Sequence, residues 1–197
     1  MKSGDRREAI ADAAIAIVAR EGLRSLTHRA IDKELGLPTG STSYYARTRR
    51  DLIEAMVHRL AARTAGDMAG VAERDITGVP GRRPVDDAAE RLARLLDRLA
   101  ERPGDHLARY ALVVELTGDP ELHARLTSAS PARAGFLAAA AETLRGLGVE
   151  EPERHAPALV AVVDGLLLDR VAGSGMDPAT RPDARETIAA YLRGLTR

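Results

Sequence analysis

The chain has 197 residues, 45% of them apolar and 29% charged, which is ordinary for a soluble globular protein and enough for one larger domain or two small ones. It contains no cysteine, which excludes disulfides, thiolate zinc sites and cysteine nucleophiles and is compatible with a reducing cytoplasm. The formal net charge is zero, which argues against a protein that binds polyanions over its whole surface.

The charge is unevenly distributed along the chain. Residues 1–60 hold 11 Lys and Arg against 8 Asp and Glu, a net charge of +3, so the remainder carries −3. This polarity suits a small basic head on a larger acidic body. Asp12, Arg20 and Glu21 interrupt the first apolar run, and no segment reaches about 18 uninterrupted apolar residues. We therefore expect neither an export signal nor a membrane span, and a cytoplasmic location.

Helical periodicity dominates from the start of the chain. Ile10, Ile17 and Val18 share one face of a first helix of roughly 17 residues, which Gly22 ends. Thr27 is the expected cap of a second, short helix, which Gly36 ends.

A third short helical segment is expected from Pro38 and Thr39 to about Tyr45. Thr48 and Asp51 then have the spacing of a capping box. They open a long fourth helix that we expect to continue to about residue 73.

Glycine and proline mark a linker at residues 77–84, after which we expect only helices. These carry, in order, Leu92 to Leu99, Leu107 to Val114, a short helix opened by Asp119-Pro120-Glu121, one opened by Ser130-Pro131, one from Pro152 to about Ala172, and a last one with Ile188 to Leu195. No credible strand or repeat period is present. The predicted fold class is therefore all-α, with nine or ten helices.

Residues 27–45 have the layout of a helix-turn-helix that reads DNA, braced by the predicted first and fourth helices. Gly40 and the small hydroxyl residues after it would let the backbone approach a groove closely. Tyr44 and Tyr45 would offer hydroxyls to phosphates and flat rings to sugars or thymine methyls. Tyr45 could instead close the core of the three-helix head.

A pattern of residues between about positions 6 and 60 supports this interpretation: Gly22, Leu26-Thr27, Arg29, Ile31, Lys33 to Leu37, Gly40, Tyr45, and Thr48-Arg49 followed by Leu52-Ile53. In this pattern the chain resembles the TetR family of repressors. It departs from the family at three places. The family usually has Ser or Thr where Pro38 stands, Tyr-His where Ser43-Tyr44 stand, and Phe where Ala46 stands.

The resemblance implies a helix-turn-helix DNA-binding domain over residues 1–65 and a helical effector-binding and dimerisation domain over residues 66–197. It also implies that the following residues contact DNA: Thr27, Arg29, Thr39, Gly40, Ser41, Tyr44, Tyr45 and Arg49. Arg49 replaces the usual Lys and would meet a phosphate with a bidentate fork. Alternatively, Arg47, Arg49 and Arg50 are a solvated helix start.

A regulator of this type would hold an effector between the fourth helix and the helices at 85–117. The candidate polar groups of that pocket are His106, Arg109, Tyr110 and Glu115. An Arg and a Glu at a helix seam are, however, more often a structural pair.

A head of this size gains affinity by pairing, so we expect a homodimer that reads two half-sites. Small residues that permit close helix approach place the interface on helices 131–147 and 153–172. The predicted interface residues are Phe136, Ala140, Leu144, Leu159, Val163, Leu166 and Leu167. The alternative is that these side chains fill the core of their own subunit.

Other functional classes find little support. The five histidines are dispersed without metal-ligand spacing, residues 36–40 lack the lysine of a phosphate loop, and no serine lies in a nucleophile-elbow frame. We expect no cofactor, no metal site and no enzymatic activity.

The sequence therefore predicts a sequence-specific DNA-binding transcriptional regulator. We expect it to be a repressor that a small-molecule effector releases from its operator. Its expected partners are an operator in double-stranded DNA, a second copy of the chain and an unknown small-molecule effector, with no membrane. The alternative function is a helical ligand-binding or scaffold protein whose head has lost DNA affinity.

Overall fold

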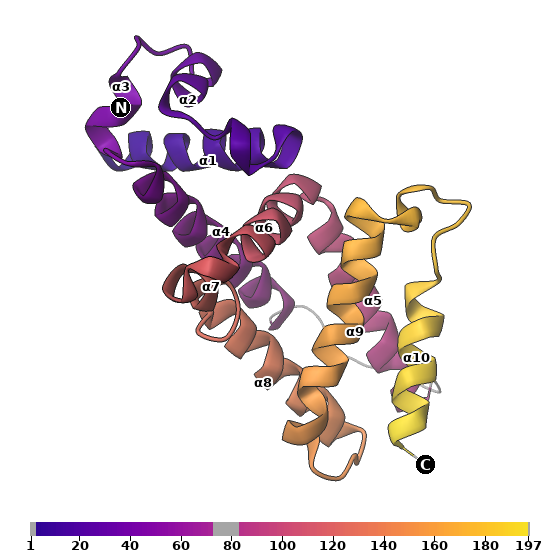
Figure 1. Cartoon of the computed structure of the whole chain (residues 1–197). Coiled ribbons are helices and arrows are strands. Elements are labelled where there is room, and N and C mark those ends of the chain that lie inside the picture. The colour runs from indigo at the N-terminus through magenta and orange to yellow at the C-terminus, as the bar shows by residue number, and fades with distance from the viewer. Residues whose placement is uncertain (1–2, 73–82, 197) are drawn as a thin grey trace. The chain divides into compact units, whose positions relative to one another are not determined.

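The computed structural model describes residues 3–72 and 83–196 (Figure 1). In this part of the chain it contains ten α-helices and no strand, which confirms the predicted all-α class. The helices are α1 Ser3–Glu21, α2 His28–Glu34, α3 Ser41–Tyr45, α4 Arg49–Ala72, α5 Pro84–Ala100, α6 Pro103–Glu115, α7 Pro120–Leu126, α8 Pro131–Gly146, α9 Pro152–Ala172 and α10 Ala184–Leu195. Short 3-10 turns lie at Leu23–Ser25, Leu116–Gly118 and Ser174–Met176.

Predicted helix starts are confirmed where a side chain caps the first turn. Thr27 accepts a hydrogen bond from the Ala30 amide at 3.1 Å, and Asp119 accepts one from the Leu122 amide at 3.2 Å. These bonds satisfy amides that have no partner inside the helix. Residue 73 and most of the predicted linker lie outside the described residues, and Pro84 is the first residue of α5.

The third helix is shorter than predicted. It begins at Ser41 instead of Pro38, because Gly40 has a φ of 91° and so lies in the left-handed region. Pro38 takes part in a turn, in which its carbonyl accepts from the Ser41 amide at 3.1 Å.

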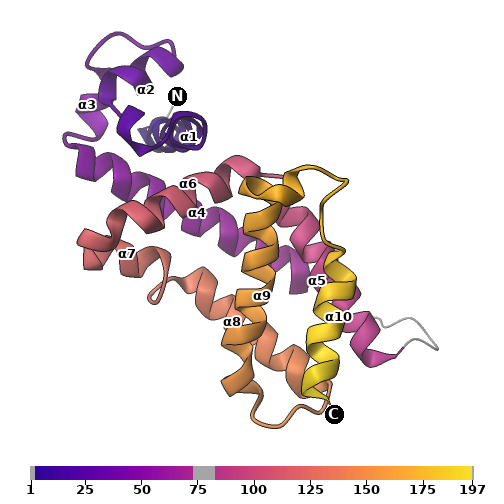
Figure 2. The ribbon, with the colours of Figure 1, turned by 45° about the vertical axis from the view of Figure 1, so that its right-hand side comes forward.

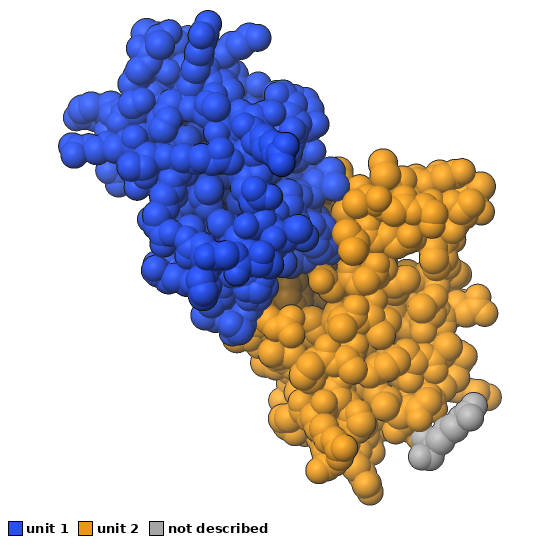
Figure 3. Space-filling model, viewed as in Figure 1, with its two compact units in different colours: residues 1–64, 104–130 blue, residues 65–103, 131–197 orange. Residues whose placement is uncertain are grey.

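The chain forms two compact units, coloured separately in Figure 3. Unit 1 comprises Met1–Thr64 and Gly104–Ser130, and unit 2 comprises Ala65–Pro103 and Pro131–Arg197. Residues 104–130, which the sequence analysis placed in the C-terminal domain, thus pack with the N-terminal helices. The functional division near residue 65 remains a prediction.

Each unit has its own hydrophobic core. In unit 1, apolar side chains of α1, the α2 region, α4, α6 and α7 pack together, with Ile17, Ile31 and Met56 among the fully buried ones. Figures 1 and 2 both show α1, α2 and α3 grouped together. In unit 2, α8 packs on α9 and α5 packs on α10 around Leu144 and Ile188. No helix in the described residues is long and apolar enough to cross a membrane.

Candidate nucleic-acid interface

The position of α2 is set by burial on one side and by an ion pair at its end. Leu26 and Ile31 are buried in the core of unit 1. At the end of α2, Glu34 accepts two hydrogen bonds from the Arg20 guanidinium of α1, at 3.2 and 3.0 Å. The bonds from Arg20 lower the pKa of Glu34 below its ordinary value. This two-bond geometry orients α2 relative to α1, although an exposed pair adds little stability.

The turn before α3 is organised by a buried carboxylate. Asp32 is only 3% exposed, and it accepts hydrogen bonds from the Gly40 amide at 2.7 Å, the Thr42 amide at 2.8 Å and the Thr42 hydroxyl at 2.6 Å. Burial raises the pKa of the Asp32 carboxyl, but the bonds from Thr42 and Gly40 outweigh burial and hold the pKa below its ordinary value. The sequence analysis did not identify Asp32.

The two adjacent tyrosines have different surroundings. Tyr44 is 83% exposed, whereas Tyr45 is half-buried and packs against the core of unit 1. Their rings meet edge to face, with centroids 5.1 Å apart. Tyr44 therefore presents its ring and hydroxyl to solvent. Tyr45 packs as the core interpretation expected, and its contact with DNA remains a prediction.

The remaining predicted DNA contacts of this region lie mostly on the surface. Thr27, Arg29, Thr39 and Gly40 are exposed, and Ser41 is half-buried. The hydroxyl of Thr27 is used as a helix cap, and the hydroxyl of Ser41 donates to the Pro38 carbonyl at 2.6 Å. Both oxygens keep lone pairs but have lost part of their freedom to rotate toward a ligand.

The first turn of α4 contains the predicted capping box. The Asp51 amide donates to the Thr48 hydroxyl at 3.1 Å, and the Asp51 carboxylate accepts from the amides of Thr48 and Arg47 at 2.9 and 2.8 Å. Hydrogen bonds from Thr48 lower the pKa of Asp51. The start of α4 is thus closed by its own side chains.

The three arginines around this turn are not equivalent. Arg50 pairs with Glu54, Asp119 and Glu121, so its charge is neutralised inside unit 1. Arg49 donates to the carbonyl of Leu23 at 2.6 Å, and this bond holds the guanidinium beside the end of α1. Arg47 is exposed and forms no ion pair with the described residues.

Further cations without ion pairs lie on and before α2. Arg29 and Lys33 are exposed, one helical turn apart on the same face, and neither forms an ion pair within residues 3–72 and 83–196. Arg24, before α2, is also exposed and forms no ion pair with the described residues. Of these three, the sequence analysis selected only Arg29. The i,i+4 spacing of Arg29 and Lys33 was the available signal for Lys33.

The predicted effector residues lie on α6 in unit 1. His106 is buried and Glu115 is exposed, while the Arg109 guanidinium lies 4.4 Å from the centre of the Tyr110 ring. The alternative ion pair between Arg109 and Glu115 is not formed among the described residues.

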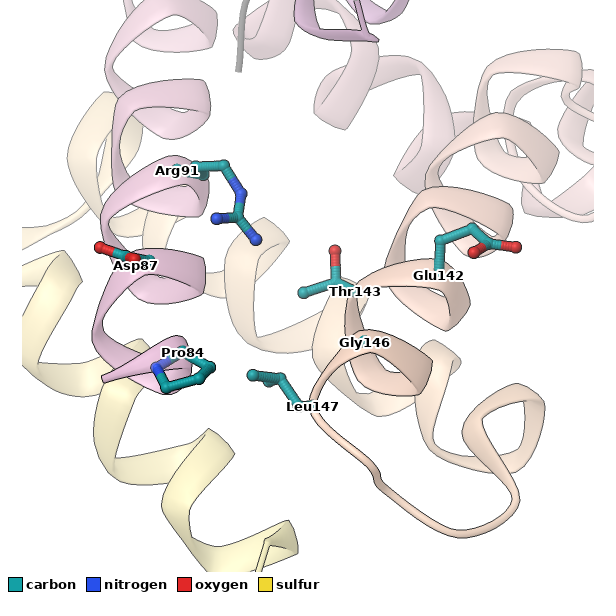
Figure 4. A pocket seen from close by; sticks show the side chains of 7 residues that line it. All are labelled: Pro84, Asp87, Arg91, Glu142, Thr143, Gly146 and Leu147. Carbon is teal, nitrogen blue, oxygen red and sulfur yellow. The ribbon is translucent and has the colours of Figure 1, made fainter. Parts of the chain in front are cut away.

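A pocket in unit 2 involves none of these four residues. It is lined by Pro84, Asp87, Arg91, Glu142, Thr143, Gly146 and Leu147. Figure 4 shows Arg91 of α5 and Thr143 of α8 pointing into the space between the two helices.

Most of the predicted dimer residues lie inside unit 2. Ala140, Leu144 and Leu159 are buried in its core, as the alternative interpretation expected, and Leu167 is also buried. Phe136, Val163 and Leu166 are half-buried.

The exposed face of α9 consists of other residues. Ala158, Ala161, Gly165 and Leu168 are exposed and follow one another at helical spacing. Leu168 has the largest apolar side chain of this group and is 44% exposed.

No cluster of three or more potential metal ligands is present among the described residues. The candidate surface of unit 1 carries hydroxyls, the exposed ring of Tyr44 and cations. Such a surface can donate hydrogen bonds to phosphates and place a ring against a sugar or base.

The tetracyclin repressor-like C-terminal domain matches residues 83–197. No curated protein sequence matches the chain. Among solved structures, a transcriptional regulator from Rhodococcus sp. Rha1 is 21% identical with a TM-score of 0.72, over 96% of this chain and 95% of that one.

Two further structures are more similar in sequence. A member of the TetR family from Streptomyces coelicolor A3 is 26% identical with a TM-score of 0.64, over 97% of this chain and 98% of that one. The multidrug binding protein EbrR, in complex with imidazole, is 28% identical with a TM-score of 0.60, over 96% of this chain and 94% of that one.

Proposed function

Because the chain belongs to the tetracycline repressor-like, or TetR, family, we propose that it represses transcription by binding an operator in double-stranded DNA. The observation that carries this proposal is the surface of unit 1. Tyr44 is exposed at the end of α3, and exposed Arg29, Lys33 and Arg47 have no ion pairs among the described residues. Cations without intramolecular partners are available to phosphates.

The proposed contacts divide into two kinds. Arg29, Arg49, Thr27 and Thr39 would contact phosphates and position the head. Gly40, Ser41, Tyr44 and Tyr45 would lie closest to the bases and sugars. Phosphate contacts set affinity and register, whereas contacts with base edges carry sequence information.

We also propose that the protein acts as a homodimer, because paired heads can read two half-sites of an operator. The proposed contact surface is the exposed stripe of α9, formed by Ala158, Ala161, Gly165 and Leu168, together with the half-buried Phe136, Val163 and Leu166. Small residues at such positions let two helices approach closely.

The proposed switch is a small molecule that contacts α6 at His106, Arg109, Tyr110 and Glu115. The similarity to EbrR, a multidrug binding protein, supports an organic ligand as effector. Arg109 and Tyr110 form a cation–aromatic pair with which a flat or polar ligand could interact.

The test is an electrophoretic mobility shift assay with the DNA upstream of the protein's own gene and with a random duplex, each at several salt concentrations. We expect tighter binding to the upstream DNA, with log K falling linearly with log salt. Tyr44→Ala should reduce the preference for the upstream DNA. Absence of salt-dependent binding to either duplex would instead favour a helical ligand-binding or scaffold protein that has lost DNA affinity.

A further inference from the structure

The helix that is expected to lie closest to DNA is too short to hold its own shape. α3 has five residues, Ser41–Tyr45. A helix of this length has a nucleation cost that its few internal hydrogen bonds do not offset, so it is not stable in isolation. Its N-cap residue, Gly40, has no side chain with which to close the first turn. The geometry of α3 must therefore be imposed by neighbouring elements.

The N-terminal end of α3 is fastened to Asp32 of α2. One carboxylate oxygen accepts from the Thr42 amide and the Thr42 hydroxyl, and the other accepts from the Gly40 amide. Asp32 and Thr42 are 3% and 0% exposed, so solvent does not compete for these bonds. Hydrogen bonds to a buried charged acceptor are stronger than those between neutral groups.

The C-terminal end of α3 is fastened to His28, also on α2. The His28 Nε2 donates to the carbonyl of Ala46, the residue that follows α3, at 2.8 Å. A carbonyl oxygen can only accept, so Nε2 carries the proton in this bond. His28 and Asp32 are four residues apart and therefore lie on the same face of α2. One face of α2 thus holds both ends of α3.

α2, which holds both ends of α3, is itself fixed in unit 1. Between His28 and Asp32, Ile31 is completely buried in the core of unit 1, and Thr27 caps the helix. The side chain of Asp32 is buried and bonded to Gly40 and Thr42, so it has almost no surface with which to contact DNA directly. Any effect of Asp32 on DNA binding would therefore be exerted through α3.

We propose that Asp32 and His28 are positioning residues, which orient α3 for DNA recognition by holding its two ends from one face of α2. This inference rests on the proposed DNA-binding function for its consequence, since the exposed Tyr44 is presented by α3. The local claim, that the two side chains fix the conformation of residues 40–46, concerns the free protein.

The first experiment measures amide hydrogen exchange in the free protein. In Asp32→Asn, one of the two acceptor oxygens is replaced by an NH2 donor, so at least one of the Gly40 and Thr42 amides loses its acceptor and should exchange faster. The Leu52 amide is the internal control, because it donates to the Thr48 carbonyl and lies outside residues 40–46. The variant's thermal unfolding, followed in parallel, shows whether unit 1 remains folded.

The second experiment compares binding to the upstream DNA with binding to a random duplex. We expect Thr42→Val, which keeps the shape of the side chain but lacks the hydroxyl, to lower the ratio of the two affinities by roughly 10-fold. Thr42→Ser keeps the hydroxyl and should retain the ratio. His28→Ala should lower the ratio, and His28→Gln, which can still donate to Ala46, should restore part of it.

The outcomes separate this inference from the proposed function. If the wild-type protein binds no duplex, the proposed function fails, and hydrogen exchange alone decides the positioning role of Asp32. If Asp32→Asn leaves the exchange of the Gly40 and Thr42 amides unchanged, the positioning role of Asp32 is wrong. An equal loss of affinity for both duplexes in Thr42→Val, with unchanged exchange, would also overturn it.

Discussion

Arg47, Arg49 and Arg50 lie within four positions of one another, yet their charges have different uses. Arg50 is paired with three carboxylates, whereas Arg49 is tied to a backbone carbonyl and keeps its full charge. A guanidinium has five N–H donors, so one bond to Leu23 leaves others available. At the residue scale, the partner of each arginine decides whether its charge is available to DNA.

We predict that Arg49→Ala weakens binding about equally on the upstream and random duplexes and lowers the salt slope by roughly one unit, as expected for a phosphate contact. Titrations at several salt concentrations measure this slope. Arg49→Lys should retain the slope, and Arg50→Ala should leave it nearly unchanged because that charge is already paired. A loss confined to the upstream duplex would mean that Arg49 reads bases.

Asp32 should make unit 1 sensitive to acid. Its folded pKa lies below its ordinary value, because the bonds from Thr42 and Gly40 and the nearby His28 outweigh burial. The stabilisation from Asp32 is therefore present above the unfolded pKa, about 3.9, and is lost as the pH falls through the folded pKa. We predict that the stability difference between the wild type and Asp32→Asn shrinks as the pH falls below about 4.

Thermal or denaturant unfolding of both proteins across pH 7 to 2 tests this prediction. Other carboxyl groups, such as Asp51 and Glu34, also have lowered pKa values, so the acid response of the wild type alone is not diagnostic. A constant stability difference across this range would contradict the role given to the Asp32 charge.

At the scale of elements, α9 has two chemically distinct faces. Leu159 lies in the core of unit 2 and Leu167 is 3% exposed, while Ala161, Gly165 and Leu168 face outward. An inward and an outward leucine are neighbours in the sequence, at positions 167 and 168. This pair allows dimerisation and folding to be tested separately.

We predict that Leu168→Glu produces a monomer that unfolds near the wild-type temperature and binds the operator weakly. Leu167→Glu should destabilise the protein by roughly 3 kcal/mol or more, because it buries a carboxylate in an apolar core. Sedimentation velocity gives the oligomeric state, and thermal unfolding gives the stability. If Leu168→Glu remains dimeric, the interface lies on another surface.

At the scale of the whole molecule, the proposed switch requires a link between effector binding and DNA binding. α4 contributes residues to both compact units. Its first turn belongs to unit 1, which carries the candidate DNA-binding surface, and its last residues belong to unit 2. A ligand can change DNA affinity only if it binds differently to the DNA-competent and DNA-incompetent states.

We predict that small apolar molecules which raise the melting temperature of the free protein release it from the operator. Typical coupling of about 1 to 3 kcal/mol corresponds to a weakening of operator binding by roughly 5- to 150-fold. A thermal-shift screen followed by competition titrations measures both effects. If every stabilising compound leaves operator affinity unchanged, the ligand site and the head are not coupled.

The order of the helices and most of their starts could be predicted from the sequence. Thr27 and Asp119 cap amides three residues away, and α9 begins and ends where Pro152 and Ala172 predicted. These signals are readable because both partners lie within one helical turn, and apolar periodicity identifies an amphipathic helix before its partner is known.

The side chains that hold the candidate site together could not be predicted in this way. Asp32 reaches Gly40 and Thr42 across 8 and 10 positions, and His28 reaches Ala46 across 18. The packing also leaves Tyr44 exposed, half-buries Tyr45 and places residues 104–130 in unit 1. Periodicity predicts that a face will be buried, but the helix that covers it depends on how the whole chain folds, because burial is a property of packed elements and not of local sequence.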